Sequence, residues 1–192
     1  MDQAQQAILA WHDVYAAAAG ATATLLGLTF IAGSIHQASS VVRQPPPRHT
    51  AWLHLLLNRY EFTTEFLALG TQTYMMFIYA FVFELVMLMP VDLPFAPGLV
   101  LVAVAGLGTV EAWLPIIGIR RRKERPPIFE QLWRYWLPAA SMFLVIAGGI
   151  ALAADKPVSL YAIAGGSALL VFGATRNSWD IFLSMGREPD AS

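Results

Sequence analysis

Five long apolar stretches, separated by shorter polar or proline-containing segments, dominate the chain. A helix needs about 20 apolar residues to cross the roughly 30 Å hydrocarbon core of a bilayer, because every backbone polar group must be satisfied internally. Each stretch is long enough to do so. The pattern therefore predicts an all-α, polytopic transmembrane helical bundle with five spans. These spans are residues 14–35, 62–89, 95–119, 132–154 and 158–183.

The segments between the spans are rich in turn-forming residues. Pro90 and Pro94 separate the second and third spans, and Asp155-Lys156-Pro157 predicts a tight turn between the last two. Residues 36–61 are expected to form a cytoplasmic proline-rich loop and an interfacial helix. The whole chain, 1–192, is expected to form a single transmembrane domain.

The basic residues support the same number of spans. If successive connections lie on alternate sides of the membrane, eleven of the twelve lysines and arginines fall on one side and only Lys156 on the other. Cytoplasmic loops carry an excess of such residues, so we expect the N-terminus outside and the C-terminus in the cytoplasm. The composition is 57% hydrophobic and 13% charged, which is unusual for a water-soluble domain and agrees with a membrane location.

The composition also excludes several classes of function. A net charge of −1 provides no basic excess for binding nucleic acid, and a chain without cysteine has no disulfide, thiolate metal site or cysteine nucleophile. The sequence lacks the common protease, hydrolase, phosphate-loop and dinucleotide motifs, and its four histidines are not spaced as metal ligands. We therefore expect neither an enzyme nor a bound cofactor or metal.

Charged residues inside the predicted spans are expected to have partners, because each costs about 2.5–3.5 kcal/mol at the bilayer centre. Arg176 and Asp180 are four residues apart and face the same way on one helix. Glu111 lies at a similar depth, and Glu65 is the second candidate carboxylate. We expect these residues, with the neighbouring Asn177, to form a buried ion-pair clamp between helices; the alternative is a gate or ion pathway at the cytoplasmic end.

Glu84 differs from the other intramembrane carboxylates because no basic residue lies at its depth. Such a group is either protonated within the bundle or faces water or a cation. One carboxylate per subunit is also what an ion-selecting ring in an oligomer requires. Glu84 is therefore a candidate pore residue, whereas Gln72 is expected to form an interhelical hydrogen bond.

Small residues form two further patterns. Ala16, Gly20, Thr24 and Gly27 recur in the first span at steps of three and four, which gives one helix face a flat surface. This face predicts close packing, either within the bundle or between subunits; the alternative is a helix that lines a pore. The sequence IAGG occurs at residues 146–149 and 163–166, and it predicts small-residue packing across a helical hairpin.

A basic cluster follows the third span and is made up of Arg120, Arg121, Arg122, Lys123 and Arg125. Its simplest role is to hold the orientation of the chain in the membrane. Contact with anionic lipid headgroups is the alternative.

Two short sequences resemble a set of small bacterial integral membrane proteins that open with a GAxATLxGLxF-like helix and close with an RNxWD-like element. They are GATATLLGLTFIAGSI in the first span and TRNSWDIFL in the last. The resemblance implies a shared four- or five-helix fold and a location in the bacterial inner membrane, and it implies no activity. The positions that it singles out are Gly20, Thr24, Gly27, Arg176, Asn177, Trp179 and Asp180.

These observations lead to a functional expectation. A five-span chain of 21.0 kDa has little room for a private transport cavity, so we expect it to work as a homo-oligomer. The leading hypothesis is an ion channel or channel-like permeation protein with the first helix near the axis. The alternative is a non-conducting accessory or scaffold subunit. The expected partners are the lipid bilayer and further copies of the chain.

Overall fold

The computed structural model describes residues 3–43, 64–89, 95–120 and 132–185, and the regular structure within these ranges is entirely helical. The long helices are α1 (Gln3–Arg43), α3 (Thr64–Leu88), α4 (Phe95–Arg120), α6 (Leu137–Ala153) and α7 (Ser159–Met185). A short π-helical turn, η2 (Leu132–Trp136), leads into α6.

Within the described residues, four stretches are long and apolar enough to cross a membrane, as expected for an integral membrane protein. They are Ile8–Ser34, Leu69–Leu88, Phe95–Trp113 and Leu132–Ala153. The remaining long helix, α7, is uncharged only as far as Thr175, and then carries Arg176 and Asp180. Four spans are thus clear from length and composition alone.

The helix ends agree with the predicted spans to within about two residues, except at both ends of the first span, because α1 begins at Gln3 and not near residue 14. The predicted span 14–35 lies inside a longer helix, because α1 continues to Arg43. Residues 36–43 are therefore helical, and the prediction that they belong to a loop was wrong. No proline interrupts the chain before Pro45, so nothing in this segment forces the helix to stop earlier. The rest of the predicted loop and the interfacial helix lies outside the described residues.

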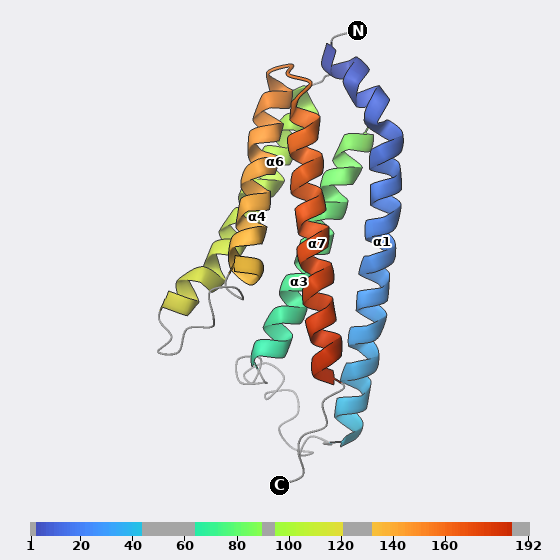
Figure 1. The fold of residues 1–192 in the computed structure, drawn as a ribbon, viewed down its shortest axis with the longest axis vertical. Helices are drawn as coiled ribbons and strands as arrows, with labels where there is room; N and C mark the ends of the chain where they lie inside the picture. The colour runs from blue at the N-terminus through green and yellow to red at the C-terminus, as the bar shows by residue number, and fades with distance from the viewer. Residues whose placement is uncertain (1–2, 44–63, 90–94, 121–131, 186–192) are drawn as a thin grey trace.

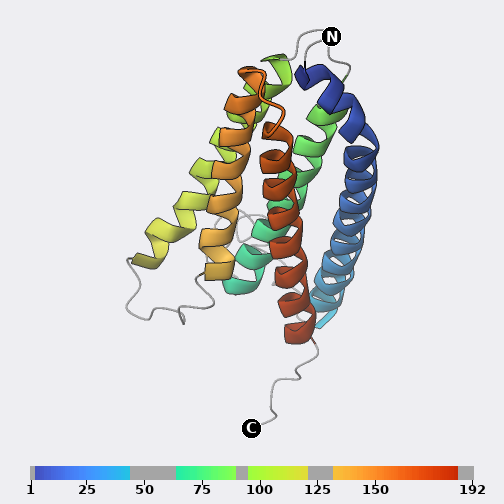
Figure 2. The same cartoon turned by 45° about the horizontal axis from the view of Figure 1, so that its top comes forward.

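The helices lie side by side, with α7 near the middle of the bundle (Figures 1 and 2). α7 packs against α6, α3 and α1, while α4 packs chiefly against α6. α1 begins, α3 ends and α4 begins at the same end of the bundle as the turn between α6 and α7 (Figure 1). We call this the turn end, after the turn at residues 154–158.

The described basic residues are distributed unequally between the two ends. Lys156 lies in the turn between α6 and α7. Arg43 and Arg120 are the last residues of α1 and α4, and Arg134 lies in η2 before α6, so all three are at the opposite end. This arrangement follows from the alternating direction of the helices.

Glycine allows unusually close contact between α4, α6 and α7. A Cβ atom on Gly98 would lie 2.5 Å from the Gly149 carbonyl oxygen, so α4 and α6 touch backbone to backbone. A Cβ on Gly148 would lie 3.1 Å from the Ser159 oxygen, and one on Gly166 would lie 2.9 Å from the Ser141 oxygen. The predicted small-residue packing across the hairpin is therefore confirmed.

The start of α6 is held by a side chain from α3. Pro138 has no N–H, so the carbonyl of Arg134, four residues earlier, lacks its usual helical donor. The Gln72 side-chain amide donates a hydrogen bond to this carbonyl. The wider π-helical turn η2 lies at the same place. The predicted interhelical hydrogen bond of Gln72 is confirmed, and its acceptor is the backbone carbonyl of Arg134.

Candidate functional site

Three helices meet at the carboxyl group of Glu84. This residue lies on α3 and is 2% exposed. Its Oε1 accepts hydrogen bonds from Thr22 Oγ1 of α1 at 3.2 Å and from Ser167 Oγ of α7 at 3.0 Å. Its Oε2 is also buried, and it has no hydrogen-bond partner among the described residues. Oε1 thus has two hydroxyl groups within hydrogen-bond distance, while Oε2 is buried and has no hydrogen-bond partner among the described residues.

The hydroxyl groups of Thr22 and Ser167 do not make the hydrogen bond to the carbonyl four residues earlier that such groups usually make in helices. Thr24 and Thr175 show the ordinary pattern, because each donates to the carbonyl four residues earlier at 2.8 Å. Thr22 bonds Glu84 instead, and Ser167 Oγ lies 3.0 Å from Glu84 Oε1 and 3.4 Å from the Ala80 carbonyl oxygen. A buried carboxyl without hydrogen bonds is costly, so these two donors stabilise it where it lies.

A tyrosine and a backbone carbonyl form the next layer toward the turn end. Tyr15 precedes Thr22 by seven residues, and Leu160 precedes Ser167 by seven residues, which is about 10.5 Å along each helix. The buried Tyr15 donates its hydroxyl proton to the Leu160 carbonyl at 3.0 Å. Tyr15 also lies within electrostatic reach of Glu84. On the opposite side of Glu84 the nearest buried residues include the apolar Phe77, Ala80 and Leu170.

No described basic side chain pairs with Glu84, so an ionised carboxylate there would be an uncompensated charge in an apolar interior. The described residues also contain no group of three or more histidines, aspartates and glutamates that could hold a metal ion. The chemistry open to the site is therefore the uptake of one positive charge. A proton could bind Oε2, or a small monovalent cation could bind the carboxylate and hydroxyl oxygens.

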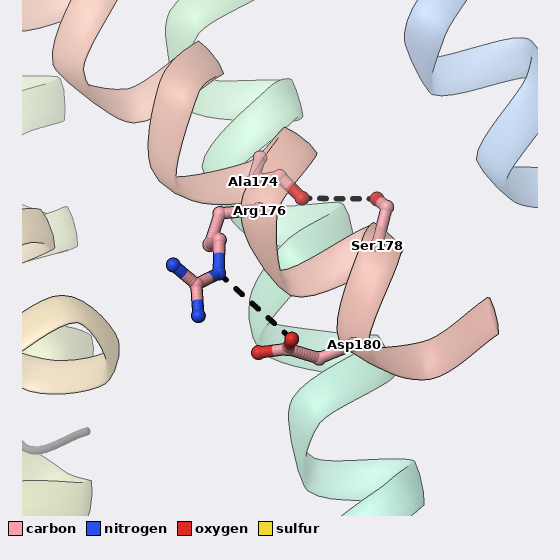
Figure 3. A network of polar contacts seen from close by, with 4 residues as sticks. All are labelled: Ala174, Arg176, Ser178 and Asp180. Carbon is pink, nitrogen blue, oxygen red and sulfur yellow. Dashed lines mark hydrogen bonds and ion pairs between the residues drawn. The ribbon is translucent and has the colours of Figure 1, made fainter. Parts of the chain in front are cut away.

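Arg176 and Asp180 pair as predicted but do so on the outer surface of α7. Arg176 Nε lies 3.8 Å from Asp180 Oδ1, and the two side chains are 45% and 37% exposed. Figure 3 shows both on the same side of the helix, while the Ser178 hydroxyl bonds the Ala174 carbonyl on another. The pair is therefore not a buried clamp.

Glu111 does not join this pair, and the prediction that it would do so is corrected. Its carboxylate is exposed on α4 and hydrogen-bonds the side chain of Tyr79 on α3. The reason is that α4 packs chiefly against α6 and not against α7. Asn177 is buried, and its amide lies 3.9 Å from the Met76 sulfur. The side chain of Glu65 lies outside the described residues, so its part in the cluster stays a prediction.

Because the Arg176–Asp180 pair is exposed, its removal is expected to change the stability only weakly. Arg176→Ala should lower the free energy of unfolding by less than about 1 kcal/mol, because an exposed ion pair at this distance is screened and loosely held. Thermal unfolding of the variant in detergent micelles would measure this. A loss of several kcal/mol would instead show that Arg176 is buried against a partner that the exposed geometry does not include.

The small-residue face of α1 points away from the bundle. Gly20, Thr24 and Gly27 are exposed, and a Cβ added to either glycine would meet nothing within 4 Å. The prediction that this face packs within the bundle was therefore wrong. The prediction that it packs between subunits stays a prediction. These residues do not lie with Glu84, which contacts the other face of α1 through Thr22. Thr22 and Thr24 are about 200° apart around the helix.

The basic cluster after the third span is described only at its start. Arg120 is the last residue of α4. Arg121, Arg122, Lys123 and Arg125 lie outside the described residues. Their contact with lipid headgroups stays a prediction.

Comparisons with known protein families, with curated proteins and with solved structures find no match for this chain.

Proposed function

We propose that this chain is a five-span protein of the bacterial inner membrane that lets protons or small monovalent cations permeate, with Glu84 as the binding site on the path. One observation carries the proposal. Glu84 is enclosed by three helices, and only one of its two oxygens is hydrogen-bonded. Ionisable residues inside membrane spans are costly and typically mark ion or proton pathways.

The position of Glu84 puts the proposed path inside each subunit. The carboxyl lies between α1, α3 and α7 of one chain, so it would not line an axis shared by several copies. Self-association remains part of the proposal. The outward face of α1, with Gly20, Thr24 and Gly27, is the surface on which copies would approach closely.

The proposed orientation places the turn end outside the cell. Four described basic residues lie toward the other end, which would face the cytoplasm: Arg43, Arg120, Arg134 and Arg176. α7 would be the fifth span. Its charged pair, Arg176 and Asp180, and its exposed Trp179 would then lie near the cytoplasmic headgroups, where both kinds of side chain are favourable.

A second function is favoured by the same hydrogen bonds. Thr22 and Ser167 tie α1 and α7 to Glu84, so the carboxyl could act as a structural link in a non-conducting accessory or scaffold subunit. The two proposals differ in whether the carboxyl exchanges its bound charge during function.

Flux through purified protein in liposomes tests the first proposal. Liposomes that contain the wild-type chain should dissipate an imposed pH gradient faster than empty liposomes, and Glu84→Gln should slow this at least tenfold, because the amide cannot carry the transferred charge. Glu111→Gln is the matched control, since its carboxylate is exposed on α4, and it should keep wild-type flux. Equal flux in the wild type and Glu84→Gln, or none above empty liposomes, would favour the scaffold.

A further inference from the structure

Glu84 lies much nearer to one end of the bundle than to the other. It precedes the end of α3 at Leu88 by four residues, which is about 6 Å. In the other direction α3 extends back twenty residues to Thr64, about 30 Å. The turn end is therefore the nearer boundary of the bundle for anything that enters or leaves the site.

One hydrogen-bonded layer separates Glu84 from the turn end. It consists of Tyr15 and the Leu160 carbonyl, joined at 3.0 Å. Tyr15 is 2% exposed, and its hydrogen bond joins α1 to α7 about two helical turns from Glu84 toward the turn end. Beyond this layer, α3 has ended, and Trp11 of α1 meets Tyr161 of α7 edge-on, with 4.9 Å between the ring centres. Ala19, Met87 and Ile163 are buried between this layer and Glu84, so movement of Tyr15 would remove the hydrogen-bonded part of the closure and leave one apolar layer.

The opposite direction is closed by apolar packing. Phe77, Ala80, Leu170 and Ala174 are each 1% exposed or less. The next buried polar side chain on α7 is Asn177, and its amide is directed to the Met76 sulfur, not toward Glu84. The interhelical hydrogen bond from the Gln72 amide to the Arg134 carbonyl lies on this side too, but Gln72 is twelve residues from Glu84, about 18 Å along α3.

The oxygens at the site fit a proton better than a metal cation. A metal cation that sheds its water needs several oxygen ligands at once. Thr22 Oγ1 and Ser167 Oγ both contact Oε1, Ser167 Oγ lies 3.4 Å from the Ala80 carbonyl as well, and no described hydroxyl contacts Oε2. A proton needs one oxygen only, and Oε2 is enclosed with no other partner among the described residues.

Few other titratable groups surround the site. Among the described residues, Tyr15 of α1 lies within electrostatic reach of Glu84. Tyr79 of α3 is engaged with Glu111 of α4, and Arg176 and Asp180 of α7 are exposed on the far half of that helix. At the turn end, α1 carries His12 and Asp13, 3.7 Å apart and exposed, and the turn carries Asp155 and Lys156. These groups lie beyond the Tyr15 layer.

We infer that Glu84 is a proton-binding site that opens to the turn end, with Tyr15 as its lid. When the Tyr15–Leu160 bond breaks, water reaches Oε2 and accepts its proton as hydronium, and the remaining carboxylate is held by Thr22 and Ser167. Return of a proton restores the neutral acid. This inference rests on the proposed function in taking Glu84 as the binding site, and it adds the ligand and the side of access.

Cysteine labelling from each side of the membrane tests the access route, because the chain contains no cysteine of its own. Glu84→Cys is reconstituted in oriented liposomes and exposed to a charged, membrane-impermeant thiol reagent. The side that labels Lys156→Cys identifies the turn end. We expect Glu84→Cys to react at least tenfold faster from that side, and Tyr15→Ala to raise its rate several-fold. Ser167→Cys serves in the same way if Glu84→Cys does not fold.

Two results would overturn the route. One is equal or faster labelling from the opposite side; the other is a rate that Tyr15→Ala leaves unchanged. Asn177→Cys is the matched control on the far half of α7 and should stay unlabelled from the turn end. Because labelling is independent of flux, loss of flux in Glu84→Gln with labelling from the wrong side would leave the proposed function standing and remove this inference.

Infrared spectroscopy tests the identity of the ligand. The carbonyl band of the protonated Glu84 carboxyl is identified as the band that the wild type shows and Glu84→Gln lacks. In the wild type, this band should disappear as the pH is raised. It should not change when sodium or potassium chloride is added at constant pH. Loss of this band on adding either salt would show that a metal cation replaces the proton, and would overturn the inference.

Discussion

Replacing Gly98 by leucine is expected to separate α4 from the rest of the bundle and to lower the free energy of unfolding by about 3 kcal/mol. The first side-chain carbon alone would lie 2.5 Å from the Gly149 carbonyl oxygen and 2.9 Å from the Ala153 nitrogen. Both are backbone atoms, so neither can rotate away. Overpacking of a tight contact usually costs 1–3 kcal/mol, and this contact has no flexible neighbour to absorb it. Thermal unfolding in detergent micelles would measure the loss.

Gly20→Leu is the matched control for this prediction. The same substitution is made on a transmembrane helix, but a Cβ on Gly20 would meet nothing within 4 Å. The stability of the single subunit should therefore stay unchanged, whereas self-association through α1 should weaken. Equal destabilisation by Gly98→Leu and Gly20→Leu would contradict the packing of α4 on α6.

Glu84→Met is expected to abolish proton flux and to leave stability unchanged or slightly higher. Methionine has a similar volume, and replacing a buried ionisable group by a well-packed apolar one is often neutral or stabilising. Thr22 and Ser167 would then donate to the carbonyls of Ala18 and Ile163, four residues earlier, as Thr24 already does to Gly20. Flux in liposomes and unfolding in micelles measure the two effects on the same preparation.

The complementary variant removes the donors and keeps the carboxyl. Thr22→Val combined with Ser167→Ala leaves Glu84 buried without a hydrogen bond, which should cost about 1–3 kcal/mol for each lost donor. If Glu84→Met destabilises the chain as much as this double variant, then the carboxyl serves as a structural link, and the scaffold becomes the better account.

Helix positions were predictable because length and hydropathy alone determine which segments can cross a bilayer. The end of α1 was not, since residues 36–43 are polar enough to look like a loop and yet contain nothing that stops a helix. The Gln72 bond was predictable in kind, because a mid-span amide needs a partner. Its acceptor became evident only once Pro138 and the Arg134 carbonyl were placed together.

The site was predicted in part, and the errors share one cause. Depth along a helix follows from sequence position, but direction around the helix depends on which neighbours pack there. Glu111 and Arg176 have similar depths, yet they lie on helices that are not close partners. α1 has one face of small residues and a second face with Tyr15 and Thr22. Both faces are weakly polar, so the sequence does not distinguish them. Only the placement of α3 and α7 shows which of them is buried.

The most direct test of the account is covalent labelling of the wild-type chain in membranes by a hydrophobic carbodiimide, because this reagent reacts with carboxyl groups that carry a proton within an apolar phase. Mass spectrometry of the digested protein identifies the modified residue. We expect an adduct at Glu84 that forms more slowly as the pH is raised and faster in Tyr15→Ala. Labelling of Glu111 without labelling of Glu84, or a rate at Glu84 that does not depend on pH, would contradict it.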